Sequence, residues 1–421
     1  MSYGIENIEH LETREAFRSR INVYLGSDDT NGMYQALKEI INNSTDEALA
    51  GYGKEIDICL DEKTSTIQVR DYGRGVPFGI KEGRNILVAI YTESHTGGKF
   101  NKGAYKNSSG LNGLGGTAVC MSSTVFTVQS IRDGKVAEAN FKQGILENYS
   151  EIDIKTFEQK CGSTGGTGTY IMFKPDKEVF VNADEDYSYD RICSEIKNIS
   201  YLNKGIKFVV ETTQGKRTEF YSKNGIADFI RDKVKSPLMK EPILAAAKDD
   251  KDEVEIAFMW SADPTQEYVF VNGLYCPQGG SPITGAKSKI TTKIKSLVSK
   301  DLSADIIRKG LVFAINCKVS EPSFSDQTKG KVLNTNLNTL ARAAFDKGLD
   351  EFANCSEFTK IAEIMKRFAK AEKAADRERQ KVLNMDKETE KEAKKKSVAA
   401  KKLKDCRVHD EKSILYITEG E

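Results

Sequence analysis

The stretch that decides the fold is Ala36-Leu-Lys-Glu-Ile-Ile-Asn-Asn-Ser-Thr-Asp-Glu-Ala-Leu-Ala-Gly51. It predicts a helix from Gly32 to Gly51. At about 100° per residue, Glu39, Asn43 and Asp46 fall on one arc, and the opposite arc is apolar: Met33, Leu37, Ile40, Ile41 and Ala48. A polar stripe on a helix is usually a solvated face, but the segments that follow favour a functional role.

Three glycine-rich segments follow this helix along the chain. Two β-like runs, residues 55–60 and 65–70, lead into Asp71-Tyr-Gly-Arg-Gly-Val-Pro77. Ser108-Ser-Gly-Leu-Asn-Gly-Leu-Gly-Gly116 comes next, and Gly165-Gly-Thr-Gly-Thr169 enters another predicted strand. Glycines at strand ends indicate turns in which the backbone approaches a neighbour or a ligand closely. Each segment alone is a weak signal, and the combination in this order is specific.

A carboxylate helix, an Asp-x-Gly-x-Gly turn, a second glycine-rich loop and a Thr-Gly-Thr strand, in this order, resemble the GHKL ATPase domain, the Bergerat fold. The spacing Glu39-x-x-x-Asn43-x-x-Asp46-Glu47-Ala-Leu-Ala-Gly51 is similar to the B subunits of DNA gyrase and topoisomerase IV, which are type IIA DNA topoisomerases. The resemblance implies an α+β protein with two α/β-layered domains. A Bergerat-fold ATPase domain would be followed by a ribosomal-S5-like transducer domain with a long C-terminal helix.

The resemblance also divides the chain. We expect an N-terminal dimerisation arm over residues 1–31, the GHKL ATPase domain over 32–212 and the transducer domain over 213–385. A basic helical linker over 386–410 and the truncated start of a TOPRIM domain over 411–421 would follow. The chain length of 421 residues agrees with more than one domain.

The residue chemistry of the first helix suits ATP hydrolysis. A carboxylate in a partly desolvated pocket can act as the base beside an attacking water, and Glu39 is the candidate. One helical turn later, Asn43 offers a neutral oxygen ligand to Mg²⁺ that accompanies ATP. Asp46 and Glu47 would support these groups through hydrogen bonds.

The turn at Asp71 suits a purine. An aspartate at a strand end can accept a hydrogen bond from the purine amino group, and in the resembled family this aspartate selects adenine. The surrounding residues would let the backbone approach the ring, shape the pocket wall and support the aspartate: Gly73, Arg74, Gly75, Pro77 and Thr169. The alternative is an ordinary tight turn.

The second glycine-rich loop suits phosphate, because its amides precede an apolar helix start. The expected phosphate-binding residues are Gly110, Leu111, Asn112, Gly113, Leu114, Gly115 and Gly116. The chain departs from the family at Asn112, where histidine is usual, and at Gly116. The resemblance places Lys99 and Tyr105 in a lid that nucleotide orders. These departures are compatible with a divergent, phage-encoded member of the family.

Three more expected nucleotide contacts come only from the resemblance. Tyr3 of the arm would touch the nucleotide of the partner protomer, unless the arm is simply a frayed terminus. Gln327 and Lys329, in Gln327-Thr-Lys329, would reach the γ-phosphate from the transducer domain and detect intact ATP.

The C-terminal region is basic and helix-forming. From Thr359 to Lys404 it has 16 Lys and Arg against 8 Asp and Glu, whereas the whole chain has a net charge of +1. The lysines expected nearest to DNA phosphates are Lys394, Lys395, Lys396, Lys401 and Lys402. Solvated lysines without a DNA role are the alternative.

The last residues, Lys412 to Glu421, match the first motif of a TOPRIM domain, with Glu419 as its Mg²⁺ ligand. Glu421 stands where the family has aspartate, and the aspartates that complete the metal site are absent. We therefore expect a fragment that does not cleave DNA alone, because the nucleophilic tyrosine belongs to a gyrase-A-like breakage-reunion subunit.

Composition restricts the location. The eight cysteines are scattered, with no C-x-x-C pair and only three histidines to complete a zinc site. No apolar run approaches the roughly 20 residues of a membrane span, and no signal peptide is evident. We expect no membrane partner and a cytoplasmic protein, associated with the nucleoid, or located in the host cytoplasm if it is viral.

The resulting hypothesis is an ATP-driven gate. ATP would join two protomers into a homodimer around a segment of double-stranded DNA, and hydrolysis would reopen it. A MutL-like mismatch-repair ATPase is one alternative. A nucleotide-gated DNA clamp with little ATP turnover is another.

Overall fold

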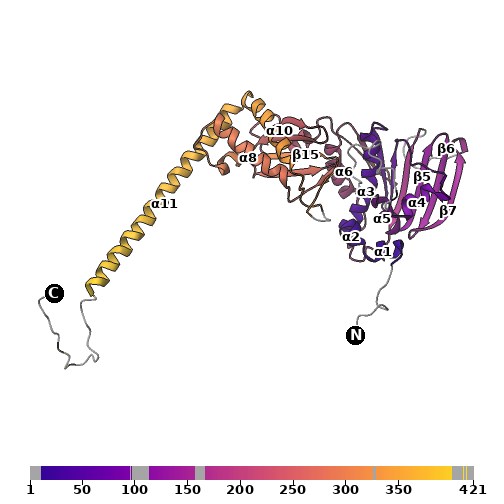
Figure 1. Cartoon of the computed structure of the whole chain (residues 1–421), viewed down its shortest axis with the longest axis horizontal. Helices are drawn as coiled ribbons and strands as arrows, with labels where there is room; N and C mark the ends of the chain where they lie inside the picture. Colours follow the sequence, from indigo (N-terminus) through magenta and orange to yellow (C-terminus); the bar gives the residue numbers. More distant parts are fainter. Residues whose placement is uncertain are drawn as a thin grey trace.

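The computed structural model describes residues 11–94, 96, 113–156, 166–325, 329–400, 411 and 414; in the C-terminal helix it describes side chains up to residue 389, residue 386 excepted. These residues form two bodies, each a β-sheet covered by helices, and one long helix that extends away from the second body (Figure 1). The α+β class with two layered domains and a long C-terminal helix is therefore confirmed.

The first body contains an eight-stranded mixed sheet in the order β10-β9-β1-β2-β8-β5-β6-β7. β1 runs parallel to β9, and the other neighbouring strands are antiparallel. The strands are β1 Glu55–Asp61, β2 Thr66–Asp71, β5 Ser123–Arg132, β6 Lys135–Lys142, β7 Ile145–Asp153, β8 Gly168–Pro175, β9 Lys207–Thr212 and β10 Arg217–Tyr221. Because β10 pairs with β9, this sheet extends past the domain boundary that we predict at residue 212.

Helices cover one face of this sheet, and their apolar side chains form its core. Ile56 and Ile58 of β1 lie in that core, whereas Glu55 and Asp57 alternate onto the other face. The helices are α1 Thr13–Ser19, α2 Ile21–Leu25, α3 Thr30–Leu49, α4 Ile86–Thr92, α5 Gly115–Met121 and α6 Tyr189–Leu202; a small hairpin, β3 Ile80–Lys81 with β4 Arg84–Asn85, and a 3₁₀ turn, Ile154–Thr156, complete the body. Phe17, Ile21 and Leu25 belong to the same core, so the predicted arm includes two helices that pack on this body.

Helix α3 is the predicted carboxylate helix. It begins at Thr30 because the Asp29 carboxylate accepts hydrogen bonds from the amides of Asn31 (2.8 Å) and Gly32 (3.2 Å). The predicted apolar arc is confirmed: Met33, Leu37, Ile40 and Ile41 are buried, and Ala48 is half-buried. On the polar arc Asp46 is only 4% exposed, whereas Glu39 and Asn43 are half-buried. The polar arc is therefore partly enclosed by protein and is not a fully solvated face.

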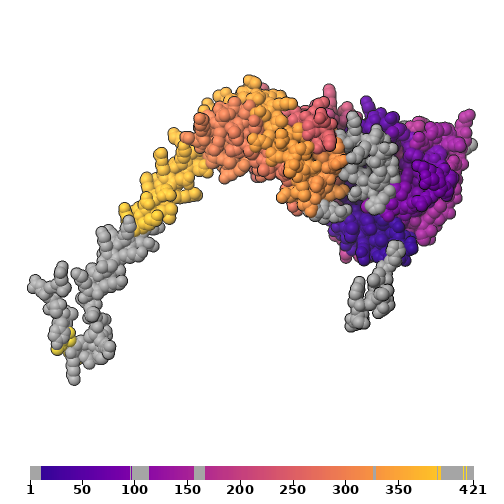
Figure 2. All heavy atoms as spheres, in the orientation of Figure 1, coloured from indigo at the N-terminus to yellow at the C-terminus, as the bar shows by residue number. Residues whose placement is uncertain are grey.

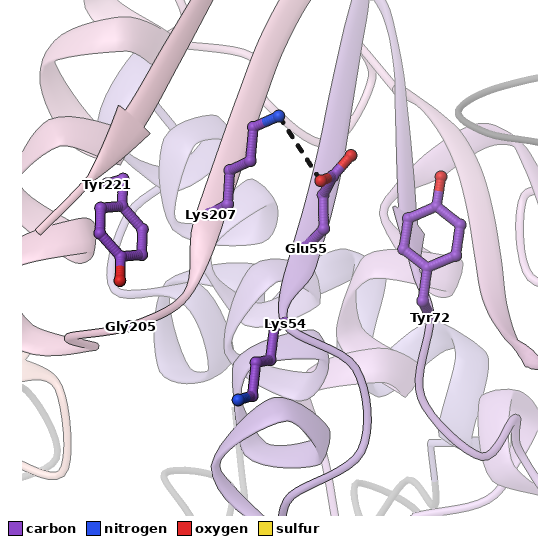
Figure 3. Close-up of a pocket in the computed structure, with 6 residues that line it drawn as sticks. All are labelled: Lys54, Glu55, Tyr72, Gly205, Lys207 and Tyr221. Carbon is purple, nitrogen blue, oxygen red and sulfur yellow. Dashed lines mark ion pairs between the residues drawn. The ribbon is translucent and has the colours of Figure 1, made fainter.

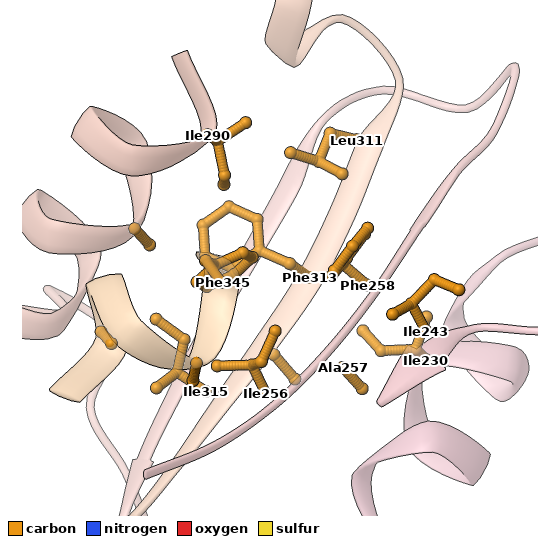
Figure 4. Close-up of a cluster of buried hydrophobic side chains, with 14 of the residues drawn as sticks. Ile230, Ile243, Ile256, Ala257, Phe258, Ile290, Leu311, Phe313, Ile315 and Phe345 are labelled. Atoms are coloured by element: carbon orange, nitrogen blue, oxygen red, sulfur yellow. The ribbon is translucent and has the colours of Figure 1, made fainter. Parts of the chain in front are cut away.

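The second body contains a five-stranded sheet in the order β11-β12-β15-β13-β14. α10 packs on one face, where Phe258 stacks on Phe345 with 5.6 Å between ring centroids, and α7 packs on the other (Figure 4). The elements are α7 Ile226–Lys233, β11 Ile243–Lys248, β12 Glu253–Trp260, β13 Gln266–Val271, β14 Leu274–Tyr275, α8 Ser281–Leu297, α9 Ala304–Arg308, β15 Leu311–Lys318 and α10 Asn336–Ala353. This body has its own apolar core, separate from that of the first.

Helix α11, Phe358–Ala400, is anchored at its start and exposed beyond it. Ile361 and Met365 are buried in the second body, whereas side chains from residue 371 to 385 are exposed (Figure 2). The helix runs without a break through residue 385, where we predict the end of the transducer domain. Within the described ranges, no helix combines the length and the apolarity that a membrane crossing needs.

Candidate active site

Asp71 is a deeply enclosed carboxylate of the predicted site. It ends β2, is 6% exposed, and faces the helices. Its Oδ1 atom accepts hydrogen bonds from the amides of Gly73 (2.9 Å) and Thr169 (3.1 Å), and its Oδ2 atom accepts one from the Ser44 hydroxyl (3.1 Å). Burial raises the pKa of this carboxyl, and the hydrogen bonds and the Arg70 charge act in the opposite direction. The structure therefore brings the predicted Asp71 and Thr169 together, through the Thr169 backbone amide.

Glu47 and Arg74 form an ion pair beside Asp71. Arg74 donates from Nη2 to Glu47 Oε1 (2.9 Å), and from Nε (3.0 Å) and its backbone amide (3.2 Å) to Glu47 Oε2. The Arg74 guanidinium also lies over the Tyr52 ring, 4.1 Å from its centroid. Arg74 is thus held on two sides, which keeps its side chain in one position.

Gly73 and Gly75 are required by packing inside the protein. A Cβ on Gly73 would lie 2.9 Å from Glu47 Cβ, and one on Gly75 would lie 2.7 Å from the Ile131 carbonyl oxygen. Gly75 also has φ = +76°, which favours glycine. The sequence predicts these glycines for the approach of a ring, and the structure shows that close packing against Glu47 of α3 and Ile131 of β5 already requires them. Pro77 is exposed at the end of the turn.

Glu39 meets the start of α5. Its Oε1 atom accepts a hydrogen bond from Gln35 Nε2 (3.0 Å), and a Cβ on Gly115 would lie 2.2 Å from its Oε2 atom. The glycine therefore lets the carboxylate lie directly against the first residue of α5. Gly113, Leu114 and Gly116 are the other described members of the predicted phosphate loop.

Asn43 and Asp46 follow Glu39 on the same helix. Asn43 is half-buried and lies one turn after Glu39, while Asp46 is buried. Within the part of the chain that the structure describes, no three His, Cys, Asp or Glu side chains form a metal-binding group. Asn43 and Glu39 lie one turn apart on the same side of α3.

Lys329 lies in the second body. It has φ = +57°, and the residues after it pair with that body: Gly330 O accepts from the Gln278 amide (2.9 Å), and Lys331 O from the Ser325 amide (3.0 Å). The other predicted site residues fall outside the described residues: Tyr3, Lys99, Tyr105, Gly110, Leu111, Asn112, Gln327, Lys401, Lys402 and Glu419. The side chains of Lys394, Lys395 and Lys396 are also outside them.

Three contributing residues are missed by sequence reasoning. Ser44 donates to Asp71, Tyr52 supports Arg74, and Thr167 Oγ1 donates to the Gly73 carbonyl (2.6 Å). A serine in the middle of a helix is a weak signal of function, although serine is unfavourable at interior positions of a helix. Thr167 belongs to the Thr-Gly-Thr motif of the predicted strand, which could have indicated it, whereas nothing local points to Tyr52.

A separate hollow of about 580 Å³ lies on the other face of the sheet (Figure 3). Its lining residues are Lys54, Glu55, Tyr72, Gly205, Lys207 and Tyr221, with Lys207 paired to Glu55 at 3.5 Å. Because strand residues alternate between faces, this hollow is not the site around Asp71 and Glu39.

Comparison with known proteins decides the family. A family described as DNA gyrase B matches residues 225–382, and one described as histidine kinase-, DNA gyrase B- and HSP90-like ATPase matches residues 28–179. The DNA gyrase B protein of Borrelia hermsii is 32% identical in an alignment that covers 100% of this chain and 67% of that protein. The chain belongs to the DNA gyrase B family. This membership decides against the MutL-like alternative.

Other gyrase B proteins and solved structures support the same family membership. The Halalkalibacterium halodurans gyrase B protein is 33% identical over 83% of this chain, and the chain spans 56% of its length. Among solved structures, the 43K ATPase domain of Thermus thermophilus gyrase B has a TM-score of 0.71 and 26% identity, and covers 88% of this chain and 98% of that one. The ATPase region of Saccharomyces cerevisiae topoisomerase II, at 19% identity and a TM-score of 0.65, shows the same fold over 86% of this chain and 99% of that one. This gyrase B family member therefore corresponds to the ATPase portion of a type IIA topoisomerase.

Proposed function

We propose that this chain binds and hydrolyses ATP to operate the DNA-entry gate of a type IIA topoisomerase. The observation that carries the proposal is the buried Asp71 carboxylate, with Glu39 on the helix that supplies its Ser44 partner. ATP would draw two copies together around a segment of double-stranded DNA, and hydrolysis would release them.

The Asp71 carboxylate fits adenine. A carboxylate has about four acceptor positions, and the described residues supply three donors, from Gly73, Thr169 and Ser44. Capacity is left for one more donor, such as the exocyclic amine of adenine. The three protein donors hold the oxygens in place before the nucleotide binds, which reduces the cost of ordering them on binding.

The side of α3 that carries Glu39 and Asn43, with the start of α5 beside it, suits the triphosphate and Mg²⁺. Mg²⁺ usually keeps several waters and takes one or two protein ligands together with phosphate oxygens. Asn43 would supply such an oxygen, and the loop that ends at Gly116 would hold the phosphates. Bound Mg²⁺ would neutralise charge on the triphosphate.

Glu39 would act as the general base. Gln35 orients its Oε1 atom, and Gly115 leaves room for its Oε2 atom. In the proposed role Glu39 accepts a proton from the attacking water. Asp46 would support this group through hydrogen bonds, whereas Glu47 holds Arg74 beside Asp71. Lys99, Tyr105, Gln327 and Lys329 would close on the phosphates, and Tyr3 would reach the partner copy, as the family resemblance implies.

The remaining parts of the proposal concern the whole enzyme. The division into arm, ATPase, transducer, linker and TOPRIM segments stays a prediction. So do the DNA-contacting lysines of the C-terminal helix, the Mg²⁺ ligand Glu419 and the gyrase-A-like partner. The exposed α11 supports a DNA role because a long helix with solvated basic side chains can follow phosphates without reading bases.

Association driven by nucleotide tests the gate. We expect light scattering to show a monomer without nucleotide and a dimer with a non-hydrolysable ATP analogue and Mg²⁺. The specific ATPase rate should also rise with protein concentration, because only the dimer is competent. A chain that stays monomeric at saturating analogue but turns over ATP would contradict the gate. Tight binding without turnover would favour the clamp.

Replacing Gly115 with alanine tests the position of Glu39. The added methyl group would displace the Glu39 carboxylate, and misplacement of a catalytic group by about 1 Å can lower a rate about 100-fold. The melting temperature should change little, because alanine favours a helix and a side-chain terminus moves easily. Steady-state ATPase assays and thermal unfolding check both results. An unchanged rate would contradict the assigned position.

A further inference from the structure

The C-terminal end of α5 is clamped by an arginine from α1. Arg18 donates from Nη1 to the carbonyl oxygen of Met121 (3.1 Å), the last residue of α5, and from Nη2 to Asp176 Oδ2 (2.7 Å). A cation at the carbonyl end of a helix interacts favourably with its unsatisfied carbonyls. One guanidinium thus joins α1, α5 and the segment after β8.

Asp176 completes the clamp. Its backbone amide donates to the carbonyl of Ser122 (2.9 Å), the residue after α5, and its carboxylate also accepts from Gln143 Nε2 (2.9 Å). The Arg18 and Asp176 side chains are only 13% and 6% exposed. Although burial opposes it, the hydrogen bonds from Arg18, the Glu178 amide and Gln143 hold the pKa of Asp176 below its ordinary value. The pair is therefore charged and firmly placed at neutral pH.

Helix α5 links this clamp to Glu39. It has seven residues, about 10 Å in length, and residues Thr117 to Met121 are all buried. Its first residue, Gly115, leaves no room between its backbone and Glu39 Oε2. Close-packed interiors transmit displacement, so a shift at the Met121 end moves the Gly115 end against the carboxylate.

We propose that Arg18 is a positioning residue for Glu39, acting through α5. The clamp sets the position of α5 along its axis, and α5 sets where the Glu39 carboxylate lies. The proposal rests on the proposed ATPase function and adds a link from α1, which follows the N-terminal segment, to the catalytic group.

Arg14 provides a matched control on the same helix. It lies one turn before Arg18 and donates from Nε to the Gln143 carbonyl (2.7 Å), on the β6–β7 turn. This hydrogen bond joins α1 to that turn and does not involve α5. Gln143 also donates from its side chain to Asp176, so Arg14→Gln weakens the attachment of α1 next to the clamp while both Arg18 hydrogen bonds, to Met121 and to Asp176, stay in place.

The test compares Arg18→Gln, Arg18→Lys, Asp176→Asn and Arg14→Gln. We expect kcat of Arg18→Gln to fall about 10- to 100-fold, with KM and analogue-induced dimerisation within about threefold of wild type. The kcat of Arg18→Lys should fall less, because lysine keeps the positive charge but cannot donate to Met121 and Asp176 with the forked geometry of arginine. Arg14→Gln should keep kcat within about twofold. Thermal unfolding shows that each variant is folded at the assay temperature.

Equal kcat losses in Arg18→Gln and Arg14→Gln would overturn the proposal, as would a raised KM with unchanged kcat. If Arg18→Gln does not fold, Arg18→Lys and Asp176→Asn decide in the same way. A wild-type chain without ATPase activity, or a Glu39→Ala variant that retains it, would instead contradict the proposed function.

Discussion

Replacing Glu39 with alanine is expected to lower the rate of ATP hydrolysis about 10²- to 10⁴-fold, the usual contribution of a general base. ATP affinity should stay nearly unchanged, because the proposed function assigns the adenine contact to Asp71 and the phosphate contacts to the loop before α5. Steady-state turnover at several protein concentrations, together with equilibrium binding of ATP, measures the two quantities separately.

Lys38→Ala is the matched control for Glu39→Ala. Lys38 is the preceding residue of α3 and pairs with Glu195 at 2.9 Å, away from α5. Its loss tests whether any truncation at this point of the helix lowers the rate. If Glu39→Ala keeps more than about a tenth of the wild-type rate, another group must act as the base.

Replacing Asp71 with asparagine is expected to weaken ATP binding about 10- to 100-fold, since a hydrogen bond to a charged group contributes about 1.5–3 kcal/mol. The asparagine oxygen can still accept from Gly73 and Thr169. Its amide nitrogen would then face the exocyclic amine of adenine, and two donors would oppose each other. Equilibrium titration of ATP, with GTP alongside, checks this result.

Asp57→Asn is the control for Asp71→Asn. Asp57 is equally enclosed, at 4% exposed, but lies on the opposite face of the sheet, where it accepts a hydrogen bond from the Tyr72 hydroxyl (2.6 Å). Burial raises the pKa of this carboxyl too. Equal losses of ATP affinity in the two variants would mean that Asp71 acts through the stability of the sheet, not through contact with adenine.

Asp71→Asn should also change stability with pH. The pKa of Asp71 is raised on folding, so its contribution to stability is fully present below the unfolded-state value and is lost as pH rises through the folded-state value. The nucleotide-free variant should therefore gain stability relative to wild type as pH rises through that interval. Melting temperatures from about pH 4 upward, measured without nucleotide, check the sign.

Several contacts of the candidate site join residues that are far apart in the chain, and a local sequence pattern cannot predict them. Thr169 meets Asp71 because β8 inserts beside β2, although the two strands are far apart in the chain. Arg18 of α1 and Asp176 are likewise far apart in the chain and are joined by a hydrogen bond only in the folded protein. Side-chain periodicity reports which face of an element is buried, but not which distant element covers it.

The sequence by itself determined the central helix, the strands on either side of the first turn and the ordered set of candidate groups. Glu39, Asn43, Asp46 and Glu47 share one helix face because of the 3.6-residue period, and Asp71 ends a strand because glycines follow it. Only the tertiary structure decided that Ser44 and the Thr169 amide hold Asp71, that Gly115 abuts Glu39, and that Arg18 clamps α5. The physical reason is that these contacts depend on the order of strands in the sheet and on which helices pack against one another over it, and non-local packing selects both.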